Sequence, residues 1–435
     1  MEIIYNYLKN AFLDIKDETK QNPPFVGVLL ILVTIPASLA VNNAALILLV
    51  GAASLKFKKQ NFQISNSIIL LILLYILMLF SAFWTIDMEE TLKGLPKELA
   101  LLIIPTVFFF ILNFTKSQKA KLLKYYSFGM VLWSFYWILH SVNQYLITEN
   151  YAAFFYHELV TKEVNAIHVS IYVSIAFFYF FTKEKKSVAS NLIALWLFFF
   201  IALLSSKNAI LTVIFLILVY TFFYSKMIKK VKIYYLITLL ATFCIAISFG
   251  KIRERFEMEI AENFTYTPGE AVKKRAGVNT VNIAEAWKKE KFDPSDYFPG
   301  TALRVYKFRM FVELFNEDPV FWKGYGLNAS KVKLRQKAKE YNLYFGYKGF
   351  NFHNQYIQNF AELGFFGFLV LIMIVLINLK NSIKSEDFLH IAFAILMISL
   401  FLTESFLWRQ RGVMFFTIMF CIFNATNHVK HTEIE

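Results

Sequence analysis

The sequence predicts an all-α, polytopic membrane protein of about 12 transmembrane helices with one large external, partly helical loop. Of its 435 residues, 57% are hydrophobic and only 17% are charged, which is more apolar surface than one water-soluble core can hide. The apolar residues gather in runs, most of them near the roughly 20 residues that a helix needs to cross about 30 Å of hydrocarbon. The one long polar stretch, residues 250–352, predicts the loop.

The apolar runs define the predicted spans in chain order, and the second of them is short for a span. The runs are 25–41, 43–55, 64–84, 100–114, 125–146, 166–181, 189–204, 209–224, 234–249, 356–379, 388–408 and 413–425. They divide the chain into an N-terminal transmembrane bundle at 1–249, an external loop domain at 250–352 and C-terminal transmembrane helices at 353–435. Within the loop, short helices are predicted at 281–291, 303–315 and 331–341.

Lysine clusters alternate along the chain and predict the orientation, because short loops rich in Lys and Arg stay in the cytoplasm. The clusters lie at 9–20, 56–59, 116–124, 183–186, 226–232 and 380–384. Both termini are therefore predicted to be cytoplasmic, and the large loop is predicted to lie on the outer side of the plasma membrane. Near the N-terminus, Ile4, Leu8, Phe12 and Ile15 share one helix face. This segment is either an amphipathic helix on the inner leaflet or an ordinary extension.

The formal net charge of +14 is divided between these topology signals and a basic external loop, which indicates an anionic partner. We expect no nucleic acid among the partners. The two cysteines, Cys244 and Cys421, both lie in predicted spans, so neither a disulfide framework nor a thiolate metal site is expected. The histidines lack metal-ligand spacing. We expect no metal and no cofactor.

Chemistry is concentrated where the polar loop meets the next span. His353 and Asn354 are followed by nine residues and then by Gly364-x-x-Gly367. A neutral imidazole at His353 can take the proton of an acceptor hydroxyl, or a protonated one can hold a diphosphate; a structural histidine is the alternative. Asn354 either orients His353 or caps the following helix. The two glycines favour close helix packing over substrate contact.

This motif, placed after a large external loop, resembles a motif of the O-antigen ligase family. The resemblance implies a multi-span enzyme that moves a glycan from an undecaprenyl-diphosphate carrier to an acceptor such as lipid A core, among membrane lipids and without nucleotide or metal. It also implies roles for Arg304 and for the turn 205–208, where the family usually has arginine and this chain has Lys207. The resemblance extends from about the seventh predicted span to the C-terminus.

Breaking a bond between a sugar and a diphosphate leaves negative charge on the leaving group, which fixed cations stabilise. Arg304 is the first candidate for this contact, and Lys207 and Arg309 are the next; cations that meet lipid headgroups are the alternative reading. Glu404, with Arg409 and Arg411, lies at the external end of a span and either lines the same cavity or serves topology and salt bridges.

Three other functions stay open from the sequence. A polymerase that joins repeat units on the same lipid carrier would share the donor chemistry and differ only in its acceptor. Transfer to a protein acceptor is a third enzymatic possibility. A transporter of an anionic lipid would be expected to place its functional charges near mid-membrane, and the centres of the predicted spans carry almost none.

Overall fold

The computed structural model describes residues 2–55, 64–110, 114–161, 163–184, 187–250, 253, 279–349 and 351–425. Within these ranges every named element is a helix, and an isolated bridge joins Thr280 to Tyr297. The predicted all-α class is confirmed. The early part of the predicted loop, 254–278, lies outside the described residues.

Each of the predicted spans contains a helix. These helices are α2 (Pro24–Thr34), α3 (Leu39–Leu55), α4 (Ile69–Phe80), α6 (Ala100–Phe110), α7 (Lys116–Thr148), α9 (Ala166–Phe181), α10 (Val188–Leu203), α11 (Lys207–Val219), α12 (Lys229–Ser248), α17 (Gln355–Ser385), α18 (Phe388–Thr403) and α19 (Gln410–Asn424). Among the described helices, three are long and apolar enough to cross a bilayer, namely Lys207–Tyr224, Lys229–Ser248 and Gln355–Ser385. Seven shorter helices are also apolar, and the full number of about 12 transmembrane helices stays a prediction.

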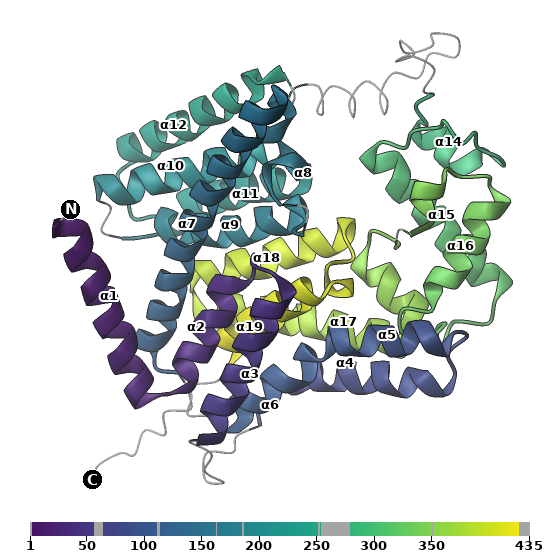
Figure 1. Ribbon diagram of the computed structural model, residues 1–435, viewed down its shortest axis with the longest axis horizontal. Coiled ribbons are helices and arrows are strands. Elements are labelled where there is room, and N and C mark those ends of the chain that lie inside the picture. The colour runs from purple at the N-terminus through teal and green to yellow at the C-terminus, as the bar shows by residue number, and fades with distance from the viewer. Residues whose placement is uncertain are drawn as a thin grey trace.

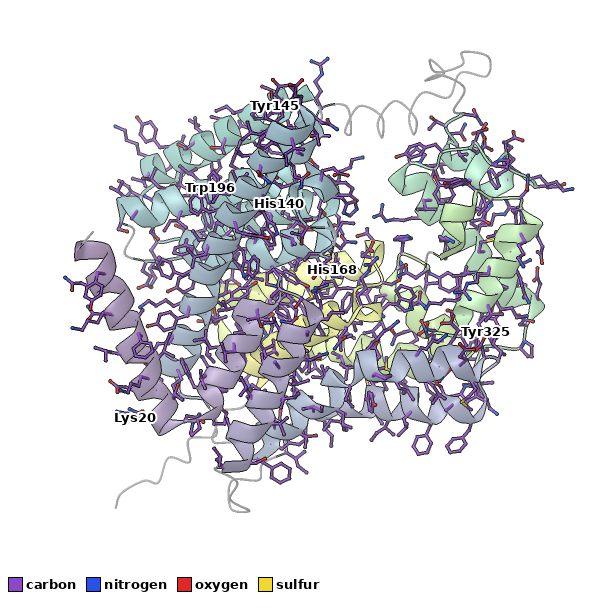
Figure 2. All side chains as sticks on the ribbon, in the orientation of Figure 1. Lys20, His140, Tyr145, His168, Trp196 and Tyr325 are labelled. Carbon is purple, nitrogen blue, oxygen red and sulfur yellow. The ribbon has the colours of Figure 1, made fainter. Side chains whose placement is uncertain are left out.

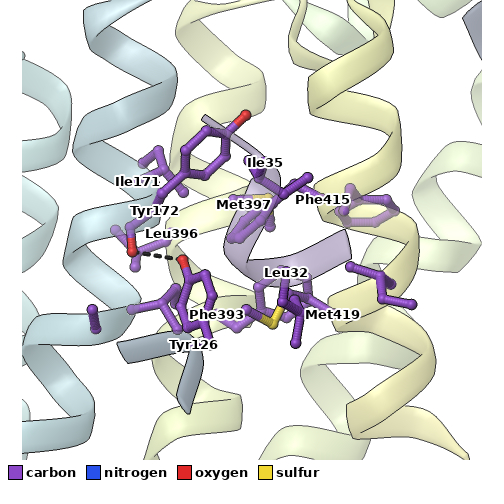
Figure 3. Packing of buried hydrophobic residues seen from close by; sticks show 14 of the residues in the cluster. Leu32, Ile35, Tyr126, Ile171, Tyr172, Phe393, Leu396, Met397, Phe415 and Met419 are labelled. Carbon is purple, nitrogen blue, oxygen red and sulfur yellow. Dashed lines mark hydrogen bonds between the residues drawn. The ribbon is translucent and has the colours of Figure 1, made fainter. Parts of the chain in front are cut away.

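Aromatic side chains fill the centre of the helical bundle, where α7, α9, α18 and α19 pack together (Figure 3). The hydroxyl of Tyr126 donates to the carbonyl of Tyr172 at 2.7 Å, so the polar tip of this buried ring has a partner. The rings of Tyr172 and Phe415 lie 4.5 Å apart. Because lipid tails are as apolar as these side chains, close packing and internal hydrogen bonds hold the bundle together.

Helix α1 (Glu2–Gln21) lies at the end of the bundle opposite to the external helices, and Lys20 marks its last turn (Figures 1 and 2). Asp14 and Glu18 form ion pairs with Lys121 of α7, which fixes α1 against the bundle. Of the four apolar residues predicted to share a face, Ile15 packs on the core and Phe12 is 66% exposed. The side chains of Ile4 and Leu8 lie outside the described set.

The predicted external loop contains α14 (Ile283–Lys288), α15 (Gly300–Glu317), α16 (Ser330–Glu340) and a 3-10 turn at Phe345–Gly349, and this part is called the external domain after that prediction. The three helices lie where the sequence predicts them. They enclose a second hydrophobic core around Phe292, Phe298 and Tyr306, separate from that of the membrane bundle. The domain therefore folds around its own apolar contacts and stands at one end of the bundle (Figure 1).

The turn 320–328 joins this domain to the bundle by backbone contact with a kink in α17. The kink lies at Gly364, whose φ of 65° and ψ of −159° are not helical. The amide of Tyr325 donates to the carbonyl of Ala361 at 2.8 Å, and the amide of Phe365 donates to the carbonyl of Phe321 at 2.7 Å. Hydrogen bonds across the junction thus satisfy backbone groups that the broken helix leaves free.

Two other contacts hold the same turn against the 3-10 turn Ser81–Phe83, which follows α4, and against the next helix, α5 (Met88–Glu98). The amide of Leu327 donates to the hydroxyl of Ser81 at 3.0 Å, and the Asn328 side chain donates to the Glu90 carbonyl at 3.0 Å. Glu90 also pairs with Lys331 and Arg335 of α16. The external domain is therefore anchored on two separate parts of the bundle.

Glycine at position 364 is required by both conformation and space. A Cβ there would lie 2.4 Å from the backbone carbonyl carbon of Trp322, and the positive φ adds strain for any other residue. We expect Gly364→Ala to detach the turn from α17 and to lower the yield of folded protein and its melting temperature in detergent. Gly51→Ala is the matched control, since nothing lies within 4 Å of its Cβ position. Equal behaviour of the two variants would contradict this account of the junction.

Lys307 is one of the cations of the basic loop that the sequence predicts to face an anionic partner, but its side chain lies inside the external domain. It is 1% exposed, and its Nζ lies 5.7 Å from the ring centre of Tyr306. Burial disfavours the charged ammonium and lowers the pKa of Lys307 to about 8. Lys307 is therefore not part of the basic surface that the sequence predicts.

This burial predicts a pH-dependent gain in stability for Lys307→Met. Between pH 8 and 10.5 the unfolded chain binds more protons than the native one, so the stability of the unmodified protein rises with pH across this window. Below pH 8 the free energy of unfolding of the variant should exceed that of the unmodified protein by about 3 kcal/mol, which corresponds to the difference of 2.5 pKa units between 10.5 and 8. This gain should vanish towards pH 10.5. Melting curves in detergent measure it, with the exposed Lys291→Met as control. A gain independent of pH would contradict a buried ammonium.

Candidate functional site

His353 lies in the short loop that leads from the external domain into α17, and its backbone is held in a special conformation. Its φ is +50°, in the left-handed region, and its amide donates to the Asn351 side chain at 2.9 Å. Asn354 is the N-cap of α17, because its side chain accepts from the amide of Ile357 at 3.0 Å. Asn354 also donates to the carbonyl of Leu402 at 3.1 Å, so it ties the start of α17 to the end of α18.

The imidazole of His353 is bonded to a buried carboxylate from another element. Its Nδ1 lies 3.1 Å from Oε2 of Glu404, the residue that follows α18. Glu404 is only 2% exposed. Two segments that are 51 residues apart in sequence thus meet in one hydrogen-bonded pair.

The charge on Glu404 fixes which nitrogen of His353 carries a proton. Burial opposes ionisation of this carboxyl, but its hydrogen bond to His353 and the positive charge of Arg304 outweigh burial and hold the pKa of Glu404 below its ordinary value. An ionised carboxylate can only accept hydrogen bonds, so Nδ1 is the protonated nitrogen. In the neutral ring, Nε2 is then the nitrogen that can accept a proton.

Arg304, on the second turn of α15, is anchored beside the same carboxylate. Its Nε donates to the carbonyl of Thr403 at 2.8 Å, and its Nη1 donates to the carbonyl of Gly300 at 3.0 Å. The peptide that links Thr403 to Glu404 is therefore contacted by Arg304, while the carboxylate of Glu404 contacts His353. The single short turn that follows α18 therefore contacts both candidate catalytic side chains, Arg304 and His353.

Two cavities meet at Arg304. The larger has a volume of about 580 Å³ and is also lined by Lys207, Asn208 and Tyr297. The smaller has a volume of about 370 Å³ and is lined by a polar set from both the bundle and the external domain. That set includes His157, Glu163, His353, Glu404, Trp408 and Arg409. Gly300 and Arg304 line both cavities, so the guanidinium stands on their shared wall.

Lys207 is the first residue of α11 and is held at the larger cavity by its neighbour. The Asn208 side chain donates to the carbonyl of Ser399 at 2.7 Å and to the hydroxyl of Thr403 at 2.5 Å. These bonds connect the beginning of α11 to the end of α18, next to Glu404. The structure thus brings His353, Arg304 and Lys207 to one region, as the sequence predicts.

Arg309 lies apart from this region. Its Nε donates to Glu313 at 2.8 Å, its Nη1 donates to the carbonyl of Lys289 at 2.8 Å, and its Nη2 donates to the hydroxyl of Tyr341 at 2.9 Å. It does not appear among the residues that line either cavity. Its charge is paired with Glu313 inside the external domain. It lies one and a half turns along α15 from Arg304.

A second histidine, His168, lies close enough to Glu404 to interact with its charge. The sequence did not predict a role for it at the site. It lies on the side of the bundle that faces the external domain (Figure 2). It is 2% exposed, and its ring centre lies 4.4 Å from that of Phe406, two residues after Glu404. No hydrogen-bond partner of its Nε2 occurs in the part of the chain that the structure describes. Its only sequence signal is a polar residue in the first turn of an apolar helix.

One comparison with known families bears on the class of protein. Residues 192–372 match the family model described as O-antigen ligase. This match confirms the family resemblance predicted from the His353 motif. The matched segment includes Lys207, Arg304 and His353, whereas Glu404 follows it. A search of curated proteins finds no match to the chain.

The apolar helices favour a membrane protein, and the matched family is one of glycosyltransferase-like enzymes. The match covers 181 of the 435 residues, less than half of the chain. In the described residues, no group of three or more His, Cys, Asp or Glu side chains is arranged to hold a metal ion.

Proposed function

We propose that this protein transfers a glycan from an undecaprenyl-diphosphate carrier to an acceptor such as lipid A core at the outer face of the inner membrane. The observation that carries the proposal is the hydrogen-bonded pair of His353 and Glu404 beside Arg304, on the shared wall of two cavities. A base and a fixed cation are the two groups that such a displacement needs.

The larger cavity is the proposed site of the donor diphosphate. Arg304 and Lys207 supply positive charge there, and the helices α11 and α15 begin at its lining residues Lys207 and Gly300. Neither helix has a side-chain hydrogen bond at its N-cap. Helix N-termini carry partial positive charge and exposed amides, which favour an anion.

The smaller cavity is the proposed site of the acceptor. The acceptor hydroxyl attacks the sugar carbon C1, and its proton passes to Nε2 of His353 as the new C1–O bond forms. The bond between C1 and the diphosphate oxygen breaks, and the electron pair leaves with the undecaprenyl diphosphate. Glu404 stabilises the imidazolium that results, and Arg304 with Lys207 stabilises the leaving group. A single displacement of this kind inverts the configuration at C1 and needs no metal.

The orientation in the membrane belongs to the same proposal. The lysine clusters favour cytoplasmic termini and a periplasmic loop domain. In agreement with this, α1 and the external helices α14 to α16 lie at opposite ends of the bundle (Figure 1). The proposed site lies at the end that carries the external domain, where a periplasmic acceptor can reach it.

A polymerase that extends the glycan on the same carrier uses the same donor site and the same base. A protein acceptor would also use them. Reconstitution of purified protein with lipid-linked glycan and lipid A core separates these possibilities by product: a glycan on lipid A core, a longer lipid-linked chain, or a glycosylated protein. A transporter would change the location of the donor and no covalent bond.

Replacement of the proposed base should remove transfer. We expect His353→Ala to lower kcat by roughly 10²- to 10⁴-fold, the usual contribution of a general base, while the protein still inserts and folds. The measurement is product formation by protein purified in detergent and supplied with donor and acceptor. His140→Ala, a histidine on α7 outside both cavities, should keep normal activity. Normal product formation by His353→Ala would overturn the proposal.

Labelling in cells tests the orientation. We expect a cysteine placed at Lys291, in the external domain, to react with a membrane-impermeant maleimide once the outer membrane is permeabilised. A cysteine at Lys20 of α1 should react only after the inner membrane is opened. Both positions are exposed, and Cys244 and Cys421 are first replaced to remove background. The reverse pattern would place His353 inside the cell and contradict the proposed site.

A further inference from the structure

We propose that Gln358 is a positioning residue that holds both members of the His353 and Glu404 pair in place; this rests on the proposed function. Gln358 lies one turn into α17 and is 1% exposed. It lines neither cavity in the described structure, so it acts through its neighbours and does not touch substrate.

The side-chain oxygen of Gln358 connects the two segments that carry the pair. It accepts from the amide of Phe352, the residue before His353, at 3.2 Å. It also accepts from the hydroxyl of Ser405, the residue after Glu404, at 3.5 Å. One oxygen atom is therefore bonded to the chain beside the imidazole and to the chain beside the carboxylate.

The side-chain nitrogen of Gln358 fixes the direction of the amide. It donates to Oε1 of Glu362, one turn further along α17, at 2.5 Å, and to the hydroxyl of Ser330 at 3.2 Å. A backbone amide such as that of Phe352 can only donate, so the oxygen of Gln358 must face it and the nitrogen must face Glu362. The amide has one orientation that satisfies all its partners.

Glu362 is itself held by the external domain. The hydroxyl of Ser330, the first residue of α16, lies 3.3 Å from Oε1 of Glu362, and the backbone amide of Asn328 also donates to this carboxyl. Asn328 is the last residue of the turn that docks on the α17 kink, and Ser330 begins the helix that follows this turn. The position of the external domain is thus transmitted through Glu362 and Gln358 to the two segments that bear His353 and Glu404.

The loss of a hydrogen bond from this network is costly because all its members are buried. Ser330, Gln358 and Glu362 are at most 4% exposed, so a partner lost from any of them leaves a polar group without water. Gln355, one turn earlier on α17, separately fixes the turn after α18 that carries Glu404, because its side-chain oxygen accepts from the amide of Leu407 at 2.7 Å. Loss of Gln358 alone should therefore displace the pair without detaching the turn.

The test exchanges the two side chains. The substitution Gln358→Glu places a second carboxylate against Glu362 and removes the hydrogen-bond donor between them. We expect kcat to fall at least about 10-fold, because small displacements of catalytic groups lower the rate steeply. KM should stay within about threefold of normal. In the double variant Gln358→Glu, Glu362→Gln, the donor lies on the other residue, and kcat should recover to within about threefold of normal. Gln358→Leu, which keeps the bulk and removes every hydrogen bond, should lower kcat and should not be rescued by Glu362→Gln.

A second buried pair of the same chemistry provides the matched control. Gln118 is 5% exposed and donates to Glu18 at 2.9 Å, at the α1 end of the bundle. Gln118→Glu should lower the melting temperature and leave kcat unchanged. The reading fails if Gln358→Leu retains full kcat, or if every Gln358 variant loses activity only in proportion to its loss of folded protein.

The two proposals fail in different ways. Normal activity of His353→Ala overturns the proposed function and with it the role of Gln358. Loss of activity in His353→Ala together with full activity in Gln358→Leu overturns only the role of Gln358. Rescue of kcat by the exchanged pair supports both, because a merely structural change would not restore the rate through reversal of one hydrogen bond.

Discussion

The backbone contact between the turn 320–328 and the kink of α17 is the constraint on which the site depends. Arg304 belongs to the external domain and His353 to the loop that follows it, whereas Glu404 and Lys207 belong to the bundle. Only a fixed junction can hold side chains from both parts at hydrogen-bond distance. Glycines at 324 and 364 allow that junction, since a Cβ at either would lie 2.4 Å from backbone of the other segment. Gly364 of the motif is therefore explained by the architecture of this junction and not by contact with substrate.

Electrostatics then determine what the assembled groups can do. A carboxylate as buried as that of Glu404 is stable only if positive charge and hydrogen-bond donors surround it. His353 and Arg304 meet this need, one at the carboxylate and the other at the preceding carbonyl. Removal of either leaves the negative charge undercompensated, so the pair and the arginine form one unit. This coupling also sets the tautomer of His353, which is the property that a proton acceptor at Nε2 requires.

Hydropathy was enough to predict the all-α class, the positions of the helices and the external helices, because each depends on neighbours in sequence. The motif at His353 pointed to the proposed site because a polar loop meets an apolar run there. Side chains whose surroundings come from distant segments were not predictable in this way. Lys307 and Arg309 resemble surface cations in sequence, yet they lie inside the external domain. Gln358 and His168 look like ordinary polar residues on apolar helices, and their partners lie near residues 404 to 406.

The position of the site at one end of the bundle has a physical reason under the proposed function. A diphosphate is too strongly hydrated to enter hydrocarbon, while an isoprenoid chain is too apolar to leave it. Cations and a base at the end of the helices let each part of the donor remain in the medium that suits it. The cavity beside Lys207 and Arg304 also borders Leu211, four residues into the apolar helix α11. The polar head and the first part of the tail can thus be bound together, so that the lipid itself orients the sugar carbon towards His353.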